Sequence, residues 1–321
     1  DHRDLHSFPT RRSSDLPYYQ KLVLDQGYYP QSLLTAPTDE DFINDIRLAK
    51  EMGFNGARRH QLVSDPRYLY HADRMGFLVW GEMANAISFD EKAVSRLVNE
   101  WSQVVLRDYN HPCIVTWVPL NESWGVPQIA HEAKQQHHAL TLYSLTKSLD
   151  ETRPVISNDG WEMVKTDICG IHNYAHGTPN HLIKRERYVQ ALRDKEGMLS
   201  YLSASRSIFA NGFHYENQPI MLTEFGGIAF ENGSSGWGYT SVKDGIKFLS
   251  EYRFLIETIA KSECIRGYCY TQLTDVFQEE NGLLTFDRKP KVELSKIREL
   301  NELIPKPILK NQSNSTKKAK S

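Results

Sequence analysis

The chain has 321 residues, of which 40% are hydrophobic and 24% are charged, a balance that is typical of globular proteins. Its 38 Lys and Arg residues face 40 Asp and Glu residues, and the formal net charge of −2 provides no basic field for a nucleic-acid backbone. The longest apolar runs, such as residues 114–118, fall well short of the about 20 residues that a membrane-spanning helix needs. Nucleic acids and membranes are therefore not expected as partners.

The two ends of the chain differ from its middle. Residues 1–16 have no hydrophobic periodicity and no signal-peptide core. Residues 6–16, HSFPTRRSSDL, resemble the translation of a sequencing adapter, so we expect residues 1–16 to be a disordered segment of non-native origin; a native basic arm is the alternative. Residues 306–321 are polar and rich in lysine, which predicts a disordered tail. The folded domain is then expected over residues 17–305.

Short apolar runs alternate with longer amphipathic ones through this domain, which is the pattern of βα units and a parallel sheet. Helices are predicted over residues 38–52, 66–75, 90–109 and 127–149, because capping residues, glycine or proline bound them. The chain offers eight candidate strands, which predict a (β/α)8 barrel, with a doubly wound sheet as the alternative. These strands are expected at residues 21–25, 55–59, 78–82, 114–120, 155–158, 168–173, 220–224 and 265–272.

Polar residues end several of the predicted strands. In a (β/α)8 barrel the C-terminal ends of the strands form the active site, so we expect these side chains to converge on one mouth. They are Arg58, Arg59, His60, Glu82, Asn121, Glu122, His172, Asn173, Tyr174, Glu224 and Gln272.

Two glutamates among them, Glu122 and Glu224, follow or end strongly apolar runs. Burial next to aromatic residues raises the pKa of a carboxyl group, so we expect Glu122 to hold a proton at neutral pH and to act as a general acid. Gly226 and Gly227 would let the backbone and a sugar approach closely. Retaining cleavage of a glycosidic bond needs two carboxyl groups about 5 to 5.5 Å apart. Each glutamate alone is also compatible with a solvated strand end or a salt bridge.

Four segments resemble glycoside hydrolase family 2. Residues 107–117, RDYNHPCIVTW, followed by NES at residues 121–123, are similar to the family's acid/base signature, R-D-x-N-H-P-S-I-x-x-W followed by N-E-S. TEFGG at residues 223–227 is similar to the nucleophile segment T-E-[FY]-G-G. GFNGAR at residues 53–58 and LYHADRMGFLVWGE at residues 69–82 resemble the second and third strand units. The similarity covers roughly residues 17–300.

The resemblance implies a (β/α)8 barrel that hydrolyses β-glycosides with retention and uses no cofactor. By position, Glu122 would be the acid/base and Glu224 the nucleophile. Asn121 would bind the sugar 2-hydroxyl, and Tyr174 would steady the nucleophile. Arg58 and Glu82 would form the floor of the site, and for Arg58 a structural ion pair is equally compatible. The other expected substrate contacts are His60, Trp124, His172 and Gln272.

Two departures from the family pattern affect these assignments. Residues 268–275 read YCYTQLTD where many family members carry a tryptophan that serves as a sugar platform. Trp124, Trp161 or Trp237 would have to replace that platform. Residues 59–63, RHQLV, stand where the family usually has S-H-Y-P, which loosens the assignment of His60.

Substrate and domain context stay open at this point. A β-galactosidase is favoured over a β-glucuronidase or a β-mannosidase, and no basic cluster for a uronate is identified. A carbohydrate-binding barrel without catalytic activity is an alternative; it predicts that one of the two carboxylates, Glu122 or Glu224, would be replaced. A metal-dependent hydrolase needs converging ligands, which His111, His137 and His138 do not provide from helical or loop contexts. Family members normally carry β-sandwich domains before the barrel; we expect those of the parent chain to be missing, and the isolated chain to be poorly soluble or weakly active.

Overall fold

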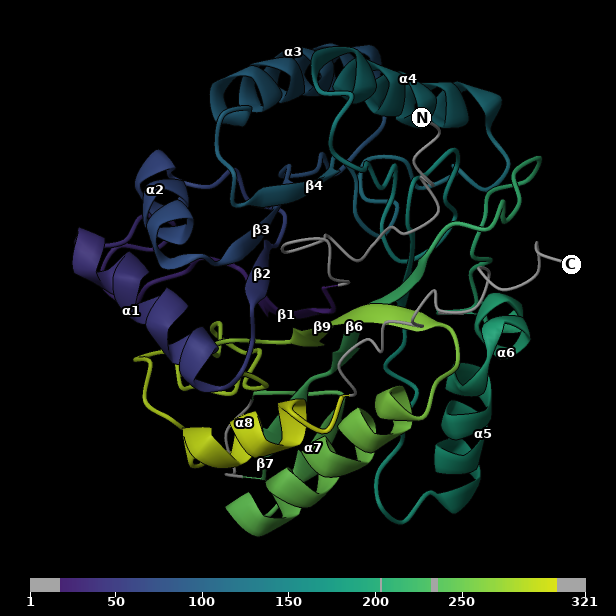
Figure 1. Ribbon diagram of the computed structural model, residues 1–321. Coiled ribbons are helices and arrows are strands. Elements are labelled where there is room, and N and C mark those ends of the chain that lie inside the picture. Colours follow the sequence, from purple (N-terminus) through teal and green to yellow (C-terminus); the bar gives the residue numbers. More distant parts are fainter. Residues whose placement is uncertain (1–17, 203, 232–235, 305–321) are drawn as a thin grey trace, which may run out of the picture.

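A seven-stranded parallel sheet forms the centre of the molecule, and helices surround it (Figure 1). The computed structural model describes residues 18–202, 204–231 and 236–304, so the two segments expected to be disordered, 1–16 and 306–321, lie outside the described residues. The strand order is β4-β3-β2-β1-β9-β6-β5. The strands are β1 (Gln20–Asp25), β2 (Gly56–Arg59), β3 (Leu78–Glu82), β4 (Ile114–Val118), β5 (Cys169–His172), β6 (Ile220–Gly226) and β9 (Ile265–Thr271), with a separate parallel pair of β7 (Ile228–Phe230) and β8 (Thr240–Val242).

The strand predicted at residues 155–158 is wrong, because this segment forms only a single bridge to β4, at Val155, and the bridge to β5 comes later, at Gly160. Its polar side chains explain the difference, since Asn and Asp compete with a strand ladder for backbone hydrogen bonds. Asn158 Oδ1 accepts a hydrogen bond from the backbone N–H of Ser123 (3.0 Å). The irregular segment therefore completes the ring between β4 and β5, and the fold is the expected (β/α)8 TIM barrel with seven regular strands.

The helices lie outside the strands (Figure 1). They are α1 (Asp39–Glu51), α2 (Pro66–Met75), α3 (Glu91–Asp108), α4 (Ala133–Leu149), α5 (Leu182–Arg193), α6 (Lys195–Ser200), α7 (Gly245–Ala260) and α8 (Leu294–Asn301). The prediction for α2 is confirmed at both ends, whereas α4 begins six residues later than predicted, at Ala133 and not at Pro127. The intervening residues form turns, in which the Gln135 side chain accepts a hydrogen bond from the backbone N–H of Gln128 (2.7 Å). None of the helices in the described ranges is long and apolar enough to cross a membrane.

Local sequence determines where the helices begin and end. Thr38 and Asp41 form a capping box at the start of α1. Asp65 caps α2 by accepting a hydrogen bond from the backbone of Arg67, and Gly76 ends that helix with a left-handed φ of 61°. These ends set where the chain turns back into each strand.

Buried tryptophans pack against both faces of the barrel strands. Trp101 of α3 packs edge to face on Trp117 of β4, with ring centroids 5.7 Å apart. Trp80 of β3 is fully buried, and its indole N–H donates to the side chain of Gln20 (2.8 Å). Because buried Trp N–H groups need such partners, these contacts fix the rings as well as burying them. The result is a rigid barrel wall behind the strand ends.

Candidate active site

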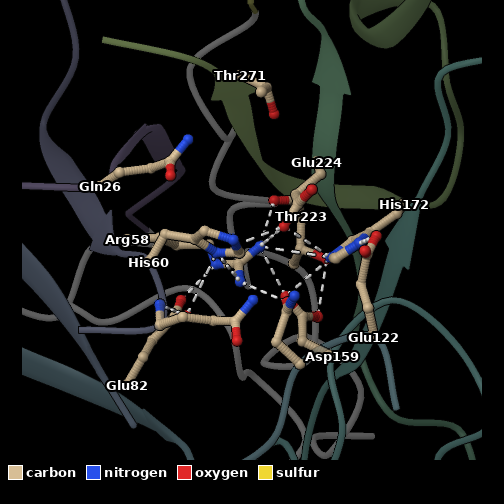
Figure 2. Close-up of polar contacts among 12 residues, drawn as sticks. Gln26, Arg58, His60, Glu82, Glu122, Asp159, His172, Thr223, Glu224 and Thr271 are labelled. Carbon is tan, nitrogen blue, oxygen red and sulfur yellow. Dashed lines mark hydrogen bonds and ion pairs between the residues drawn. The ribbon is translucent and has the colours of Figure 1, made fainter. Parts of the chain in front are cut away.

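Charged side chains from five neighbouring parts of the barrel meet at the C-terminal ends of the strands (Figure 2). β2 supplies Arg58, β3 supplies Glu82, β5 supplies His172 and β6 supplies Glu224. Glu122 joins them from the chain just after β4. Parallel strands present their carboxyl ends on one face, which explains why residues far apart in sequence converge.

Glu122 and Glu224, the two glutamates singled out by their positions in the sequence, lie next to each other. One carboxylate oxygen of each lies within 4.8 Å of the other. His172 lies between them, with Nδ1 2.7 Å from Glu122 Oε1 and Nε2 3.5 Å from Glu224 Oε1. The Glu122 side chain is 25% exposed and that of Glu224 is 7% exposed, so the pair has one outer and one inner member.

Arg58 lies beneath the pair and is fully buried. Its Nε donates to Glu82 (2.6 Å), and its Nη1 contacts Glu224 (3.1 Å) and Asp159 (2.8 Å). Its Nη2 donates to the amide oxygen of Asn121 (3.1 Å). Each nitrogen of the guanidinium thus has a partner inside the protein. The side chain forms the floor of the site and fixes the carboxylates above it.

Glu224 is held from a second side by Tyr174. The Tyr174 hydroxyl donates to Glu224 Oε2 (2.6 Å) and contacts Thr271 Oγ1 (2.7 Å). Burial and the negative charge of Glu224 raise the pKa of Tyr174 well above its usual value, so the hydroxyl keeps its proton. Both oxygens of Glu224 therefore accept hydrogen bonds, Oε1 from Arg58 and Oε2 from Tyr174.

Gly226 and Gly227 make room for tyrosine rings. Both have positive φ, 90° and 68°, which glycine adopts without strain. A Cβ on Gly226 would lie 2.3 Å from the ring of Tyr270, and one on Gly227 would lie 2.5 Å from the ring of Tyr239. The space that we expected to serve a sugar thus admits Tyr239, which stacks on Tyr174 with ring centroids 3.5 Å apart.

The backbone of Glu122 is strained. Glu122 and Ser123 have φ of 52° and 59°, a region that costs a residue other than glycine about 1–3 kcal/mol. The irregular segment after Pro154 holds this geometry, because the N–H of Glu122 donates to the backbone oxygen of Asp159 (2.9 Å) and the Ser123 hydroxyl donates to Glu162 (2.7 Å). These bonds turn the Glu122 side chain toward Glu224.

The expected pKa of Glu122 is wrong. Burial alone would raise the pKa, but His172 beside it, helped by His60 and Arg58, holds it below its usual range. Burial would also lower the pKa of His172, whereas the charges of Glu224 and Asp159 and a hydrogen bond with Glu122 raise it to about 10. At neutral pH the proton therefore resides on His172, 2.7 Å from Glu122, and the two groups titrate as a pair.

His60 and Glu82 form the side of the site toward β2 and β3. His60 Nδ1 lies 3.6 Å from Glu82 and 3.7 Å from Glu224, and its side chain is 15% exposed. Burial would lower the pKa of His60, but Glu82 and Glu224 raise it. Burial would raise the pKa of Glu82, but Arg58 and His60 lower it. Glu82 is buried and ionised, so His60 is the member of this pair that a ligand can reach.

The remaining residues predicted to contact the substrate differ in how accessible their side chains are to a ligand. The amide oxygen of Asn121 is occupied by Arg58, so its nitrogen is the end left for a ligand. Trp124 is 50% exposed. Gln272 is buried, and its amide nitrogen donates to Asn281 (2.7 Å) and Glu279 (3.1 Å).

The two other candidate tryptophans pack on residues of the site. Trp161 lies edge-on to His172, with ring centroids 5.7 Å apart. Trp237 lies edge-on to Tyr239, with ring centroids 5.4 Å apart, and is 42% exposed. Trp237 is therefore partly open to solvent, whereas Trp161 is buried beside His172.

Asp159 is a central residue that the sequence analysis did not include. Its Oδ2 lies 2.8 Å from Arg58 Nη1 and 3.1 Å from His172 Nε2, and its Oδ1 accepts a hydrogen bond from Thr223 (2.8 Å). Burial would raise its pKa, but Arg58 and His172 lower it to about 2. The signal was present, because Asp159 directly follows the strand predicted at residues 155–158.

Among the described residues, two groups of side chains have the composition of a metal site. The first is Glu122, His172 and Glu224, in which both ring nitrogens of His172 already contact carboxylates, Nδ1 that of Glu122 (2.7 Å) and Nε2 that of Asp159 (3.1 Å). The second is Asp73, His111 and Cys113, in which His111 bonds to Asp73 (2.6 Å) and burial raises the pKa of the thiol.

Two cavities of the described structure lie at the opposite end of the barrel. They have volumes of about 580 and 650 Å³, border Pro219, just before β6, and are lined by residues such as Glu263 and Arg153. None of the charged residues at the strand ends lines either cavity. The chemistry of the side chains locates the candidate site.

The sequence of the chain is similar to those of glycosyl hydrolases. Residues 36–305 match the family model described as glycosyl hydrolases family 2, TIM barrel domain. Over 142 residues the chain is 34% identical to a β-galactosidase of Vibrio vulnificus (strain YJ016), an alignment that covers 41% of this chain and 13% of that protein. Over 223 residues it is 23% identical to a β-galactosidase of Leuconostoc mesenteroides, covering 66% of this chain and 18% of that protein.

Solved structures share the fold at low sequence identity. A family 2 β-galacturonidase from Eisenbergiella tayi bound to galacturonate superimposes with a TM-score of 0.69 and 17% identity, over 91% of this chain and 52% of that chain. A β-glucuronidase from Faecalibacterium prausnitzii superimposes with a TM-score of 0.66 and 20% identity, over 91% of this chain and 50% of that chain. The chain thus spans about half the length of these solved chains, and the match to the family model shows that it belongs to glycosyl hydrolase family 2, of which it forms the TIM barrel domain.

Proposed function

We propose that this barrel hydrolyses β-glycosides with retention of configuration, with Glu122 as acid/base and Glu224 as nucleophile. The observation that carries the proposal is the approach of the two carboxylates to within 4.8 Å. Retaining glycosidases hold such groups about 5 to 5.5 Å apart, whereas inverting enzymes leave about 6.5 to 9.5 Å for a water molecule.

In the first step Glu224 attacks the anomeric carbon and forms a glycosyl ester, while the bond to the leaving oxygen breaks. The Glu122–His172 pair supplies the proton that the leaving oxygen takes. Arg58 and Tyr174 favour this step because their hydrogen bonds fix the carboxylate of Glu224 in position. In the second step the pair takes a proton from water, which attacks the same carbon and releases Glu224.

A galactoside is the substrate that the relatives favour. The β-galactosidases of Vibrio vulnificus and Leuconostoc mesenteroides carry this activity in their names. The two solved structures compared above are named for uronic acids, which makes a uronide the competing substrate. We place Asn121, His60 and Trp124 at the sugar because each has an open group at the mouth of the barrel.

The proposal is tested with nitrophenyl β-galactoside, β-glucoside, β-mannoside and β-glucuronide on the wild-type chain and the variants Glu122→Ala and Glu224→Ala. Azide enters the gap left by Glu224 and should restore turnover of Glu224→Ala with an α-glycosyl azide as product. With Glu122→Ala, azide should instead attack the glycosyl-enzyme and give a β-glycosyl azide. Unchanged hydrolysis by Glu224→Ala, or the reverse assignment of the two azide products, contradicts the proposal.

A further inference from the structure

A third carboxylate, Glu279, lies among side-chain amides at the ends of β1 and β9. The amide nitrogen of Gln26, just after β1, donates to Glu279 Oε2 and to the amide oxygen of Gln272, at 2.9 Å each. The amide nitrogen of Gln272 donates to the same oxygen of Glu279 (3.1 Å). Within the described ranges, no positively charged side chain pairs with Glu279. The amides therefore fix this carboxylate without neutralising its charge.

The Glu279 cluster, which consists of Gln26, Gln272, Glu279 and Asn281, belongs to the same mouth as the catalytic pair. Gln272 follows Thr271, which shares the Tyr174 hydroxyl with Glu224. Figure 2 shows Gln26 and Thr271 around the same opening as Arg58 and Glu224.

Tyr239 links the cluster to the pair electrostatically. Its ring stacks on Tyr174, which donates to Glu224. Burial raises the pKa of Tyr239, and the negative charges of Glu224, Glu122 and Glu279 add to the increase. The negative charges of the three carboxylates thus act on one ring.

Asn281 adds a hydrogen-bond donor without a partner. The side chain is fully buried, and its amide oxygen accepts from Gln272 (2.7 Å). No described residue accepts a hydrogen bond from its amide nitrogen. A Cβ on Gly227 would lie 3.5 Å from that nitrogen, so the donor faces the chain just after Glu224.

The cations nearest to the pair are already committed to carboxylates. Arg58 and His172 are fully buried and contact both Glu224 and Asp159. His60 lies between Glu82 and Glu224. A uronate that took one of these cations would leave a buried carboxylate without its partner, which is strongly unfavourable.

We propose that Glu279 makes the site selective for neutral sugars and excludes uronic acids. This inference rests on the proposed glycosidase function. A sugar hydroxyl carries no charge and can donate a hydrogen bond to Glu279. A uronate would bring a further negative charge to a site that already carries Glu122, Glu224 and Glu279. Repulsion between these like charges would weaken the binding of the uronate. The uronidases that share the fold then differ from this chain in substrate.

The test measures binding, which does not require turnover. Phenyl β-D-thiogalactoside and phenyl β-D-thiogalacturonide differ only at C6, and the matching gluco pair is measured in parallel. By calorimetry at pH 7, the wild-type chain should bind a neutral ligand at least tenfold more tightly than its uronide. Glu279→Gln keeps the shape of the side chain and removes its charge. This variant should lower the ratio of the uronide Kd to the neutral-ligand Kd at least tenfold, which corresponds to about 1.4 kcal/mol.

Two further variants sharpen the test. Gln26→Lys places a cation beside Glu279 and should also strengthen uronide binding, which keeps the proposal testable if Glu279→Gln does not fold. Glu263→Gln removes a carboxylate from the cavity at the opposite end of the barrel and should leave the ratio unchanged. Wild-type uronide binding as tight as neutral binding, or a ratio insensitive to both cluster variants, overturns this inference alone. Binding of neither pair, with no hydrolysis, overturns the proposed function itself.

Discussion

Glu224 and Glu122 are the same kind of residue in unlike surroundings. Glu224 lies within the regular strand β6, is 7% exposed and accepts hydrogen bonds from Arg58 and Tyr174. Glu122 lies on a strained backbone after β4, is 25% exposed and shares a proton with His172. In the proposed mechanism, the carboxylate that attacks carbon is thus held in place by two hydrogen bonds, whereas the one that exchanges a proton lies nearer to solvent, beside a histidine that holds the proton.

The largest expected effect is on kcat/KM, and its dependence on the leaving group of the substrate distinguishes the roles of the two glutamates. Glu122→Ala should lower kcat/KM by about 10² to 10⁴ for an alkyl glycoside, because a general acid contributes that much when the leaving oxygen needs a proton. The loss should nearly vanish for a dinitrophenyl glycoside, whose leaving group departs as an anion. Glu224→Ala should lose activity on both substrates alike. An equal loss on both substrates for Glu122→Ala contradicts its role as the acid.

A smaller effect concerns the hydrogen bond that holds Glu224. Tyr174→Phe removes the 2.6 Å bond to Oε2, and a hydrogen bond to a charged group contributes about 1.5–3 kcal/mol. We expect kcat/KM to fall about 10- to 100-fold, mainly through kcat. Tyr188→Phe is the matched control, because that buried hydroxyl has no hydrogen-bond partner among the described residues. Equal losses in both variants would show that Tyr174 acts through packing.

The smallest effect is on stability. The pKa of His172 is raised from 6.5 to about 10 in the folded protein, so its charge stabilises the fold fully below about pH 6.5, and this contribution is lost as the pH rises toward 10. The melting temperature of wild type should exceed that of His172→Gln most at pH 5 to 6, and the difference should shrink as the pH rises. His214→Gln, at a largely exposed position, should show no such trend. A difference that grows with pH is the contrary outcome.

The strand pattern of the sequence predicted that four side chains of the site converge. Arg58, Glu82, His172 and Glu224 lie at or near the C-terminal ends of their strands, and the TIM barrel rule then places them together. Glu122 was identified because the acid/base signature, which begins at Arg107, continues past the end of β4 to the NES segment at residues 121–123.

The parts that were not predicted depend on irregular backbone. Asp159 lies where side-chain hydrogen bonds replace a strand ladder, so its position on the mouth follows from tertiary contacts. Glu279 and Asn281 come from the chain after β9, which has no periodicity to interpret. The pKa of Glu122 depends on how closely the His172 ring approaches its carboxylate. Neither the composition of the sequence nor the spacing of its motifs encodes that distance.

The most direct test of the account is covalent labelling of the nucleophile. 2-Deoxy-2-fluoro-β-galactosyl fluoride slows the second step more than the first, so a retaining enzyme accumulates the glycosyl ester. Mass spectrometry of a proteolytic digest should find the fluorosugar on Glu224, in wild type and in Glu122→Ala, and no adduct in Glu224→Ala. A sugar attached to Glu122 or to any other residue would contradict the assignment.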